Sequence, residues 1–80
     1  MKELDRWRER IDEIDSELVR LLNERAACAA EIGEIKKSKG LPVEYPEREA
    51  AILKRVCEEN TGPLGNDAVA AFFRTVIENC

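Results

Sequence analysis

The chain has 80 residues, of which 38% are charged, and its formal net charge at pH 7 is −4. This length corresponds to one domain with a modest core, so a stabilising partner is expected. The acidic balance argues against a nucleic-acid binder, and the absence of histidine excludes histidine metal sites and Ser–His or Cys–His catalysis.

The first half of the chain carries apolar residues at steps that alternate between three and four. This spacing places them on one face of a helix. Gly40 followed by Pro42 is a stop signal, and the lysines just before Gly40 suit the negative end of a helix dipole. The pattern predicts one long helix over about residues 4–39. The apolar residues of this stripe are Leu4, Trp7, Ile11, Ile14, Leu18, Leu21, Cys28, Ile32 and Ile35.

Two shorter helices are predicted in the second half. Pro46 suits a first helical turn and is followed by acidic residues, which predicts a helix over about 46–60. A Gly- and Pro-containing loop follows, and Asn66 or Asp67 can cap a third helix over about 66–80. The apolar face of the third helix is expected to hold Val69, Phe72, Phe73, Val76, Ile77 and Cys80.

The long helix is too long for a compact monomer. At 1.5 Å per residue it measures roughly 50 Å, whereas a compact chain of this size is about 30 Å across. A second copy packed antiparallel would cover the apolar stripe. We therefore expect an all-α fold of three helices per chain, one long and two short, in an intertwined homodimer. The alternative is an ordinary three-helix bundle with a frayed long helix.

Several charged residues stand on or beside the apolar faces. Arg25 occupies a core position of the long stripe, where a guanidinium is costly unless it is paired. Lys36 lies about three turns further on the same face, ~16 Å away, so both side chains can lean toward one small ligand. Arg8 is ~25 Å from Arg25 along the helix and can serve the same ligand only from a partner chain. Arg48 and Glu49 border the apolar face of the second helix. A small dianion is the expected ligand.

At these residues the chain resembles the helical chorismate mutase family, whose members occur alone or fused to prephenate dehydratase. The resemblance rests on an ordered set of residues at fixed spacings over 8–49, and the third helix matches more loosely. The set is Arg8, Ile11, Asp12, Ile14, Asp15, Leu18, Leu21, Leu22, Arg25, Ile32, Gly33, Lys36, Pro42, Val43, Arg48 and Glu49.

The resemblance implies a site built from both chains of a dimer. Arg8 of one chain and Arg25 of the other would hold the two carboxylates of chorismate. Lys36 would reach a carboxylate and the breaking ether oxygen. Glu49 would accept the substrate's ring hydroxyl, and Arg48 would order that end of the site. The implied activity is the rearrangement of chorismate to prephenate in aromatic amino acid biosynthesis.

The chain departs from the family pattern at two places. The residue before the proline of the second helix is often an aspartate that meets the hydroxyl, and here that place is Tyr45, with Glu44 just before it, so one of these two residues is expected to substitute. Family members also carry Gln or Glu about one turn, ~4 residues, beyond Cys80. We therefore expect a domain trimmed at its C-terminus or a reduced activity, with Cys80 as the binding candidate at that end.

No cofactor or metal is expected, because a one-molecule pericyclic reaction needs neither. An odd number of cysteines, Cys28, Cys57 and Cys80, without a signal-peptide pattern indicates reduced thiols in a cytoplasmic protein. No apolar run approaches the ~18 residues that a membrane span needs. Two alternative functions remain open at this point: an isochorismate pyruvate-lyase, and a non-catalytic dimerisation or regulatory domain with the same fold.

Overall fold

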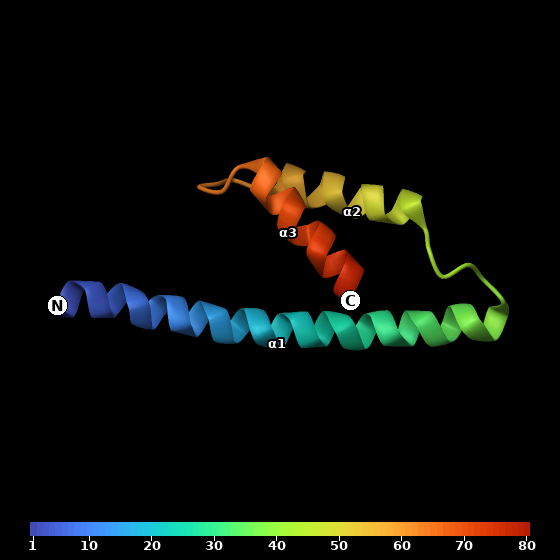
Figure 1. Cartoon of the computed structure of the whole chain (residues 1–80), viewed down its shortest axis with the longest axis horizontal. Coiled ribbons are helices and arrows are strands. Elements are labelled where there is room, and N and C mark those ends of the chain that lie inside the picture. Colours follow the sequence, from blue (N-terminus) through green and yellow to red (C-terminus); the bar gives the residue numbers. More distant parts are fainter.

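Three helices make up the computed structural model, which describes all residues from 1 to 80. They are α1 (Lys2–Lys39), α2 (Pro46–Glu59) and α3 (Asn66–Asn79), as Figure 1 shows. The all-α class with one long and two short helices is confirmed. Helix α1 begins at Lys2 rather than near residue 4, because polar residues with Glu3 and Asp5 suit a first helical turn as well as apolar ones do.

The C-terminal end of α1 is closed by a glycine in the left-handed conformation. Gly40 has φ 67° and ψ 28°. Its backbone N–H donates to the carbonyl of Lys37 at 3.3 Å, and the N–H of Leu41 donates to the carbonyl of Lys36 at 2.8 Å. These are the two hydrogen bonds of a Schellman motif. Lys36 therefore lies in the last turn of α1, just before the chain leaves the helix.

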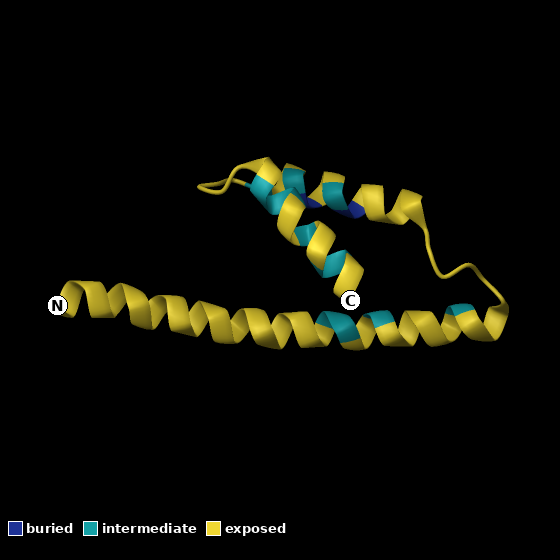
Figure 2. Ribbon diagram, in the orientation of Figure 1, coloured by how far each residue is buried: buried dark blue, intermediate teal, exposed yellow.

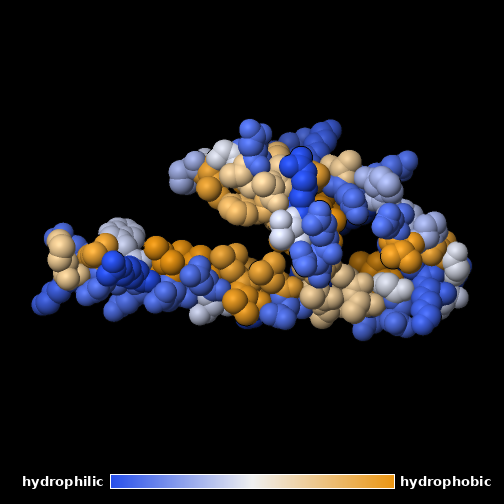
Figure 3. Space-filling view, in the orientation of Figure 1, coloured by the Kyte–Doolittle hydropathy of each residue, from blue (hydrophilic) through white to orange (hydrophobic).

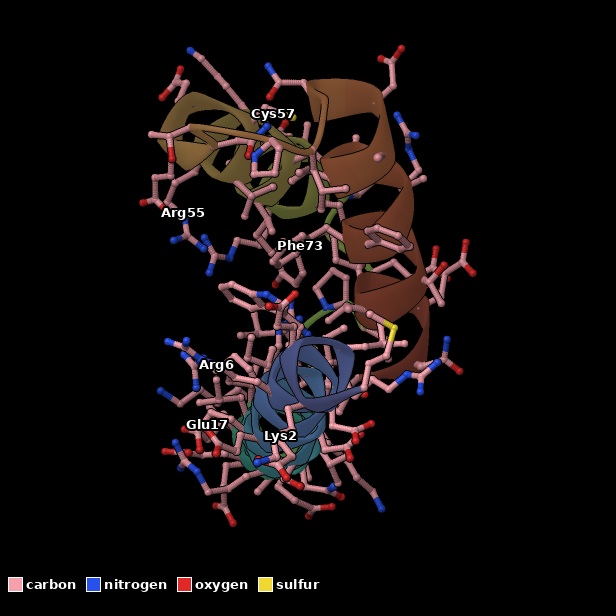
Figure 4. All side chains as sticks on the ribbon, turned by 90° about the vertical axis from the view of Figure 1, so that its left-hand side faces the viewer. Lys2, Arg6, Glu17, Arg55, Cys57 and Phe73 are labelled. Carbon is pink, nitrogen blue, oxygen red and sulfur yellow. The ribbon has the colours of Figure 1, made fainter.

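Helices α2 and α3 pack against each other and form the only buried core of the single chain. Ile52 and Val56, one turn apart on α2, are its two buried residues, at 7% and 8% exposed. Cys57 lies where α2 meets α3, and Phe73 lies between these helices and α1 (Figure 4). The loop between the helices is held by Asn60, whose amide nitrogen donates to the carbonyl of Leu64 and to the side chain of Asn66, both at 2.8 Å.

The chain is extended for its size. It measures 57 × 23 × 15 Å and has a radius of gyration of 16.3 Å, against about 12 Å for a compact chain of this length. Its accessible surface is 7001 Å², which is about 2,100 Å² more than the ~4,900 Å² of a compact monomer of this mass. In Figure 1 the N-terminal half of α1 projects beyond α2 and α3 with nothing against it.

The apolar stripe of α1 is exposed along its whole length. No residue of α1 is buried, and Figure 2 shows its N-terminal half exposed throughout. Figure 3 shows apolar side chains along the side of α1 that faces α2 and α3, continuing beyond them toward the N-terminus. On α3, Phe72 is exposed as well, although the sequence pattern places it on the apolar face. Within one chain, nothing covers these side chains.

The remaining surface of α1 carries ion pairs between neighbouring turns. Arg10 lies 3.2 Å from Glu13, and Arg20 contacts both Glu17 and Glu24, the latter at 2.9 Å. Because these pairs are exposed to solvent, they add little to the stability of the helix. None of the three helices combines the length and the apolar character that crossing a membrane requires.

The C-terminal cap of α1 can be tested by substitution. Gly40→Ala is expected to lower the free energy of unfolding by about 1 kcal/mol, because a Cβ disfavours the left-handed conformation. Gly40→Asn should lose less, since asparagine tolerates this conformation best among residues with a side chain. Urea denaturation followed by circular dichroism measures both. Equal losses for the two variants would contradict the assignment of the cost to the positive φ.

Candidate functional site

A cavity of about 670 Å³ lies between the C-terminal half of α1, the start of α2 and the end of α3. A volume of this size suits a small-molecule ligand. Seven residues are candidates from the sequence, and six of them line this cavity. These six are Arg25, Lys36, Tyr45, Arg48, Glu49 and Cys80. The fold therefore gathers in one place residues that are up to 55 positions apart in the chain.

Arg25 links α1 to the end of α3. Its Nη1 donates to the backbone carbonyl of Cys80 at 2.9 Å and lies 3.7 Å from the Cys80 Sγ. Arg25 is half-buried at this junction, and no Asp or Glu side chain lies within ion-pairing distance of it. This contact with one backbone oxygen leaves most of its five N–H donors free for an anion.

Lys36 is held from the segment that connects α1 to α2. Its Nζ donates to the backbone carbonyl of Val43 at 3.3 Å. The same nitrogen stands 4.3 Å from the centre of the Tyr45 ring, which is within cation–π range. An ammonium has three N–H donors, so this arrangement leaves capacity for a ligand oxygen.

Arg48 and Glu49 belong to the first turn of α2. Their backbone N–H groups donate to the carbonyl of Tyr45 at 3.0 and 3.1 Å, which fixes the turn from which both side chains extend. Pro46 occupies the first position of the helix, where its missing N–H costs nothing. Both side chains are solvent-exposed in the single chain, at the edge of the cavity.

The charges in the cavity are unbalanced. Arg25, Lys36 and Arg48 face one carboxylate, Glu49, and none of the four takes part in an ion pair. Arg20, on the outer surface of α1, behaves differently, because its hydrogen bond with Glu17 raises its pKa above the ordinary value. A cluster of unpaired cations in a largely apolar cavity favours the binding of a small anion with more than one negative group.

Arg8 is the one predicted site residue outside the cavity. It lies in the N-terminal half of α1, its side chain is 66% exposed, and it forms an ion pair with Asp5 at 3.9 Å. This placement agrees with the expectation that Arg8 cannot reach the Arg25 site of its own chain, because α1 is a continuous helix between them.

Two features of the cavity have no signal in the sequence pattern. The carbonyl of Val43 contacts Lys36, but a backbone acceptor in a connecting segment is not visible in residue types. Cys28 lines the cavity from α1, although its place in the apolar stripe made it a core candidate. No group of three or more Cys, Asp or Glu side chains is placed to hold a metal ion.

Comparisons of the sequence and of the structure with known proteins point to the same family. The family model described as chorismate mutase type II matches residues 7–80. A chorismate mutase from Thermus thermophilus superimposes with a TM-score of 0.94 at 30% identity, and the alignment covers 96% of each chain. The chorismate mutase of Methanocaldococcus jannaschii is 36% identical over 63 residues, which are 75% of this chain and 64% of that protein.

Longer relatives contain a similar domain. The bifunctional chorismate mutase/prephenate dehydratase of Neisseria gonorrhoeae is 49% identical over 73 residues, or 91% of this chain. The chain spans about a fifth of the length of that relative, as the matched region is 20% of it.

The cation cluster predicts a measurable preference for small dianions. Titrating the isotope-labelled protein with malonate should shift the NMR signals of the Arg25 and Arg48 guanidinium groups and of the Lys36 ammonium. The shifts should weaken at high salt, because the attraction is electrostatic. Arg20 serves as an internal control, since it already contacts two carboxylates. Equal shifts at Arg20 and at the cavity would indicate general screening rather than a site.

Proposed function

The chain belongs to the chorismate mutase type II family, and from this premise we propose that it catalyses the rearrangement of chorismate to prephenate. The observation that carries the proposal is a set of three cations around one 670 Å³ cavity, Arg25, Lys36 and Arg48, none of which pairs with an Asp or Glu side chain. Chorismate carries two carboxylates and an ether oxygen, so its charges complement such a site.

Each side chain has a role that fits its chemistry. The fork-shaped guanidinium of Arg25 binds one carboxylate of the substrate in a bidentate manner. Lys36 reaches a carboxylate and the ether oxygen as a point donor. At the start of α2, Glu49 accepts the ring hydroxyl and Arg48 orders that end of the site. Cys80 lies beside Arg25 and borders the same ligand.

The reaction requires no nucleophile, metal or proton shuttle from the protein. The site must hold the substrate in its compact, reactive conformer and stabilise the negative charge that grows on the ether oxygen. A rate gain of about 10⁶ corresponds to about 8 kcal/mol, and one well-placed donor in a dry site contributes roughly 3–4 kcal/mol of this. Several cations, in a cavity that a second chain closes, supply the required order of magnitude.

A second copy of the chain closes the site in this proposal. The surface of about 2,100 Å² that each chain exposes beyond a compact monomer amounts to about 4,200 Å² for two chains, which is the size of an obligate dimer interface. Antiparallel packing of two α1 helices covers both exposed stripes. It also brings the N-terminal half of one α1 beside the C-terminal half of the other, which carries Arg8 to the partner's cavity.

We also propose that the protein works in a reducing compartment, the cytoplasm. Cys28, Cys57 and Cys80 are all free, and free thiols of this kind are typical of proteins in a reducing environment.

The activity is tested by following chorismate and prephenate by NMR with the purified chain. Lys36→Ala should lower kcat/KM by about 10²–10³-fold, because it removes a donor to the developing charge. Arg20→Ala is the matched control, as Arg20 is a cation of α1 outside the cavity, and it should stay close to the parent protein. Circular dichroism should report similar helicity in all three proteins. A parent protein that forms no prephenate above the uncatalysed rate would contradict the proposal.

The shared site is tested by complementation. Arg8→Ala and Lys36→Ala proteins, each nearly inactive, are unfolded, mixed equally and refolded. About half of the dimers should then be mixed, and each mixed dimer has one site with both residues intact, by the symmetry of a two-fold dimer. About a quarter of the sites should therefore recover activity.

Two measurements decide the outcome of this experiment. Native mass spectrometry shows whether mixed dimers of the 9.1 kDa chain have formed. If they form and the activity stays at the level of the two parents, Arg8 does not act in the partner's site. A folded monomer at micromolar concentration would contradict the dimer itself.

A further inference from the structure

We propose that Tyr45 is a positioning residue for Lys36, acting through the face of its ring rather than through its hydroxyl. The Lys36 Nζ lies 4.3 Å from the centre of the Tyr45 ring, well within the ~6 Å at which an ammonium is attracted by an aromatic face. The inference rests on the proposed function, because it assigns Tyr45 a part in the same reaction.

The Lys36 ammonium is held by two contacts from one short segment. The carbonyl of Val43 accepts a hydrogen bond from Nζ at 3.3 Å, and the Tyr45 ring lies against the same nitrogen. A lysine side chain has four rotatable bonds, and holding its end reduces the freedom that is lost when a ligand binds. These two contacts therefore keep the ammonium at the cavity before the substrate arrives.

Tyr45 is itself fixed by the start of α2. It precedes Pro46, which disfavours the helical conformation for its backbone, and it adopts the non-helical angles φ −131° and ψ 87°. Its carbonyl accepts the N–H groups of Arg48 and Glu49. One residue thus connects Lys36 to both charged side chains of α2, and a displacement of its backbone would move all three.

The geometry distinguishes the ring from the hydroxyl. The sequence pattern placed Tyr45 where an acidic side chain would meet the substrate's hydroxyl. The Tyr45 hydroxyl takes part in no hydrogen bond of the structure, whereas the ring makes the contact with Lys36. If the hydroxyl acts in the reaction, removing the hydroxyl should lower kcat. If the ring face acts, removing the aromatic ring should lower kcat.

The test compares Tyr45→Leu, Tyr45→Phe and a protein with trifluorophenylalanine at position 45. Tyr45→Leu should lower kcat about two- to five-fold with little change in KM, the size expected from a cation–π contact at a half-exposed site. Tyr45→Phe keeps the aromatic ring, so it should retain most of the kcat of the parent protein. Trifluorophenylalanine should behave like leucine, since fluorine removes the negative charge from the ring face without changing its packing much.

A second measurement does not depend on activity. An aromatic ring against Nζ shifts the NMR signals of the adjacent Lys36 ε-methylene protons upfield. This shift should be present in the parent protein and in Tyr45→Phe, and absent in Tyr45→Leu. Circular dichroism confirms that each variant keeps its helices.

Each alternative outcome has a distinct meaning. Absence of the Lys36 shift in the parent protein would overturn the contact and the positioning role. A Tyr45→Phe protein as slow as Tyr45→Leu would overturn the ring-face role and indicate a contact of the hydroxyl with the substrate. A clear Lys36 shift in a protein that forms no prephenate would overturn the proposed function, and with it the positioning role, while the contact itself stands.

Discussion

The apolar stripe on α1, which the single chain leaves exposed, is the constraint on which the arrangement of the helices depends. A helix from Lys2 to Lys39 carries an apolar side chain every three or four residues, and α2 and α3 together are too short to cover it. The single chain buries only Ile52 and Val56. The free energy gained by burying two apolar side chains is far smaller than the conformational entropy that is lost when 80 residues are ordered. The single chain therefore leaves the apolar stripe of α1 without a covering element.

The same long helix also arranges the chemistry. Because α1 is rigid, Arg25 and Lys36 stand on one face at a spacing that the helix alone sets. The end of α3 meets α1 at Arg25, through the carbonyl of Cys80, and the connecting segment meets it at Lys36, through Val43 and Tyr45. The two cations that the sequence analysis placed on the apolar face thus also form hydrogen bonds that link α1 to the rest of the chain. Fold and site share these contacts, so their substitution affects packing as well as charge.

The short segment between α1 and α2 positions charged side chains of both helices. Gly40 ends α1 one turn after Lys36, and Pro46 starts α2 one residue after Tyr45. Between them the chain has room for only a tight return, which places the Val43 carbonyl and the Tyr45 ring against the Lys36 ammonium. The carbonyl of Tyr45 then anchors the first turn of α2 and the two charged side chains on it.

The sequence by itself determined the three helices, their order and the family. Alternating steps of three and four, the Gly40 and Pro46 boundaries and the charged residues at core positions are local properties, and local periodicity is sufficient to define helices. It also indicated Arg25, Lys36, Arg48 and Glu49 as a group, because their spacings match one ordered pattern. Only the tertiary structure decided what these side chains contact: the Cys80 carbonyl on Arg25, the Val43 carbonyl and the Tyr45 ring on Lys36, and the place of Cys28 in the cavity wall. Such contacts depend on where the chain turns between helices and on the direction of backbone carbonyls, and neither is encoded in the periodicity of side-chain types.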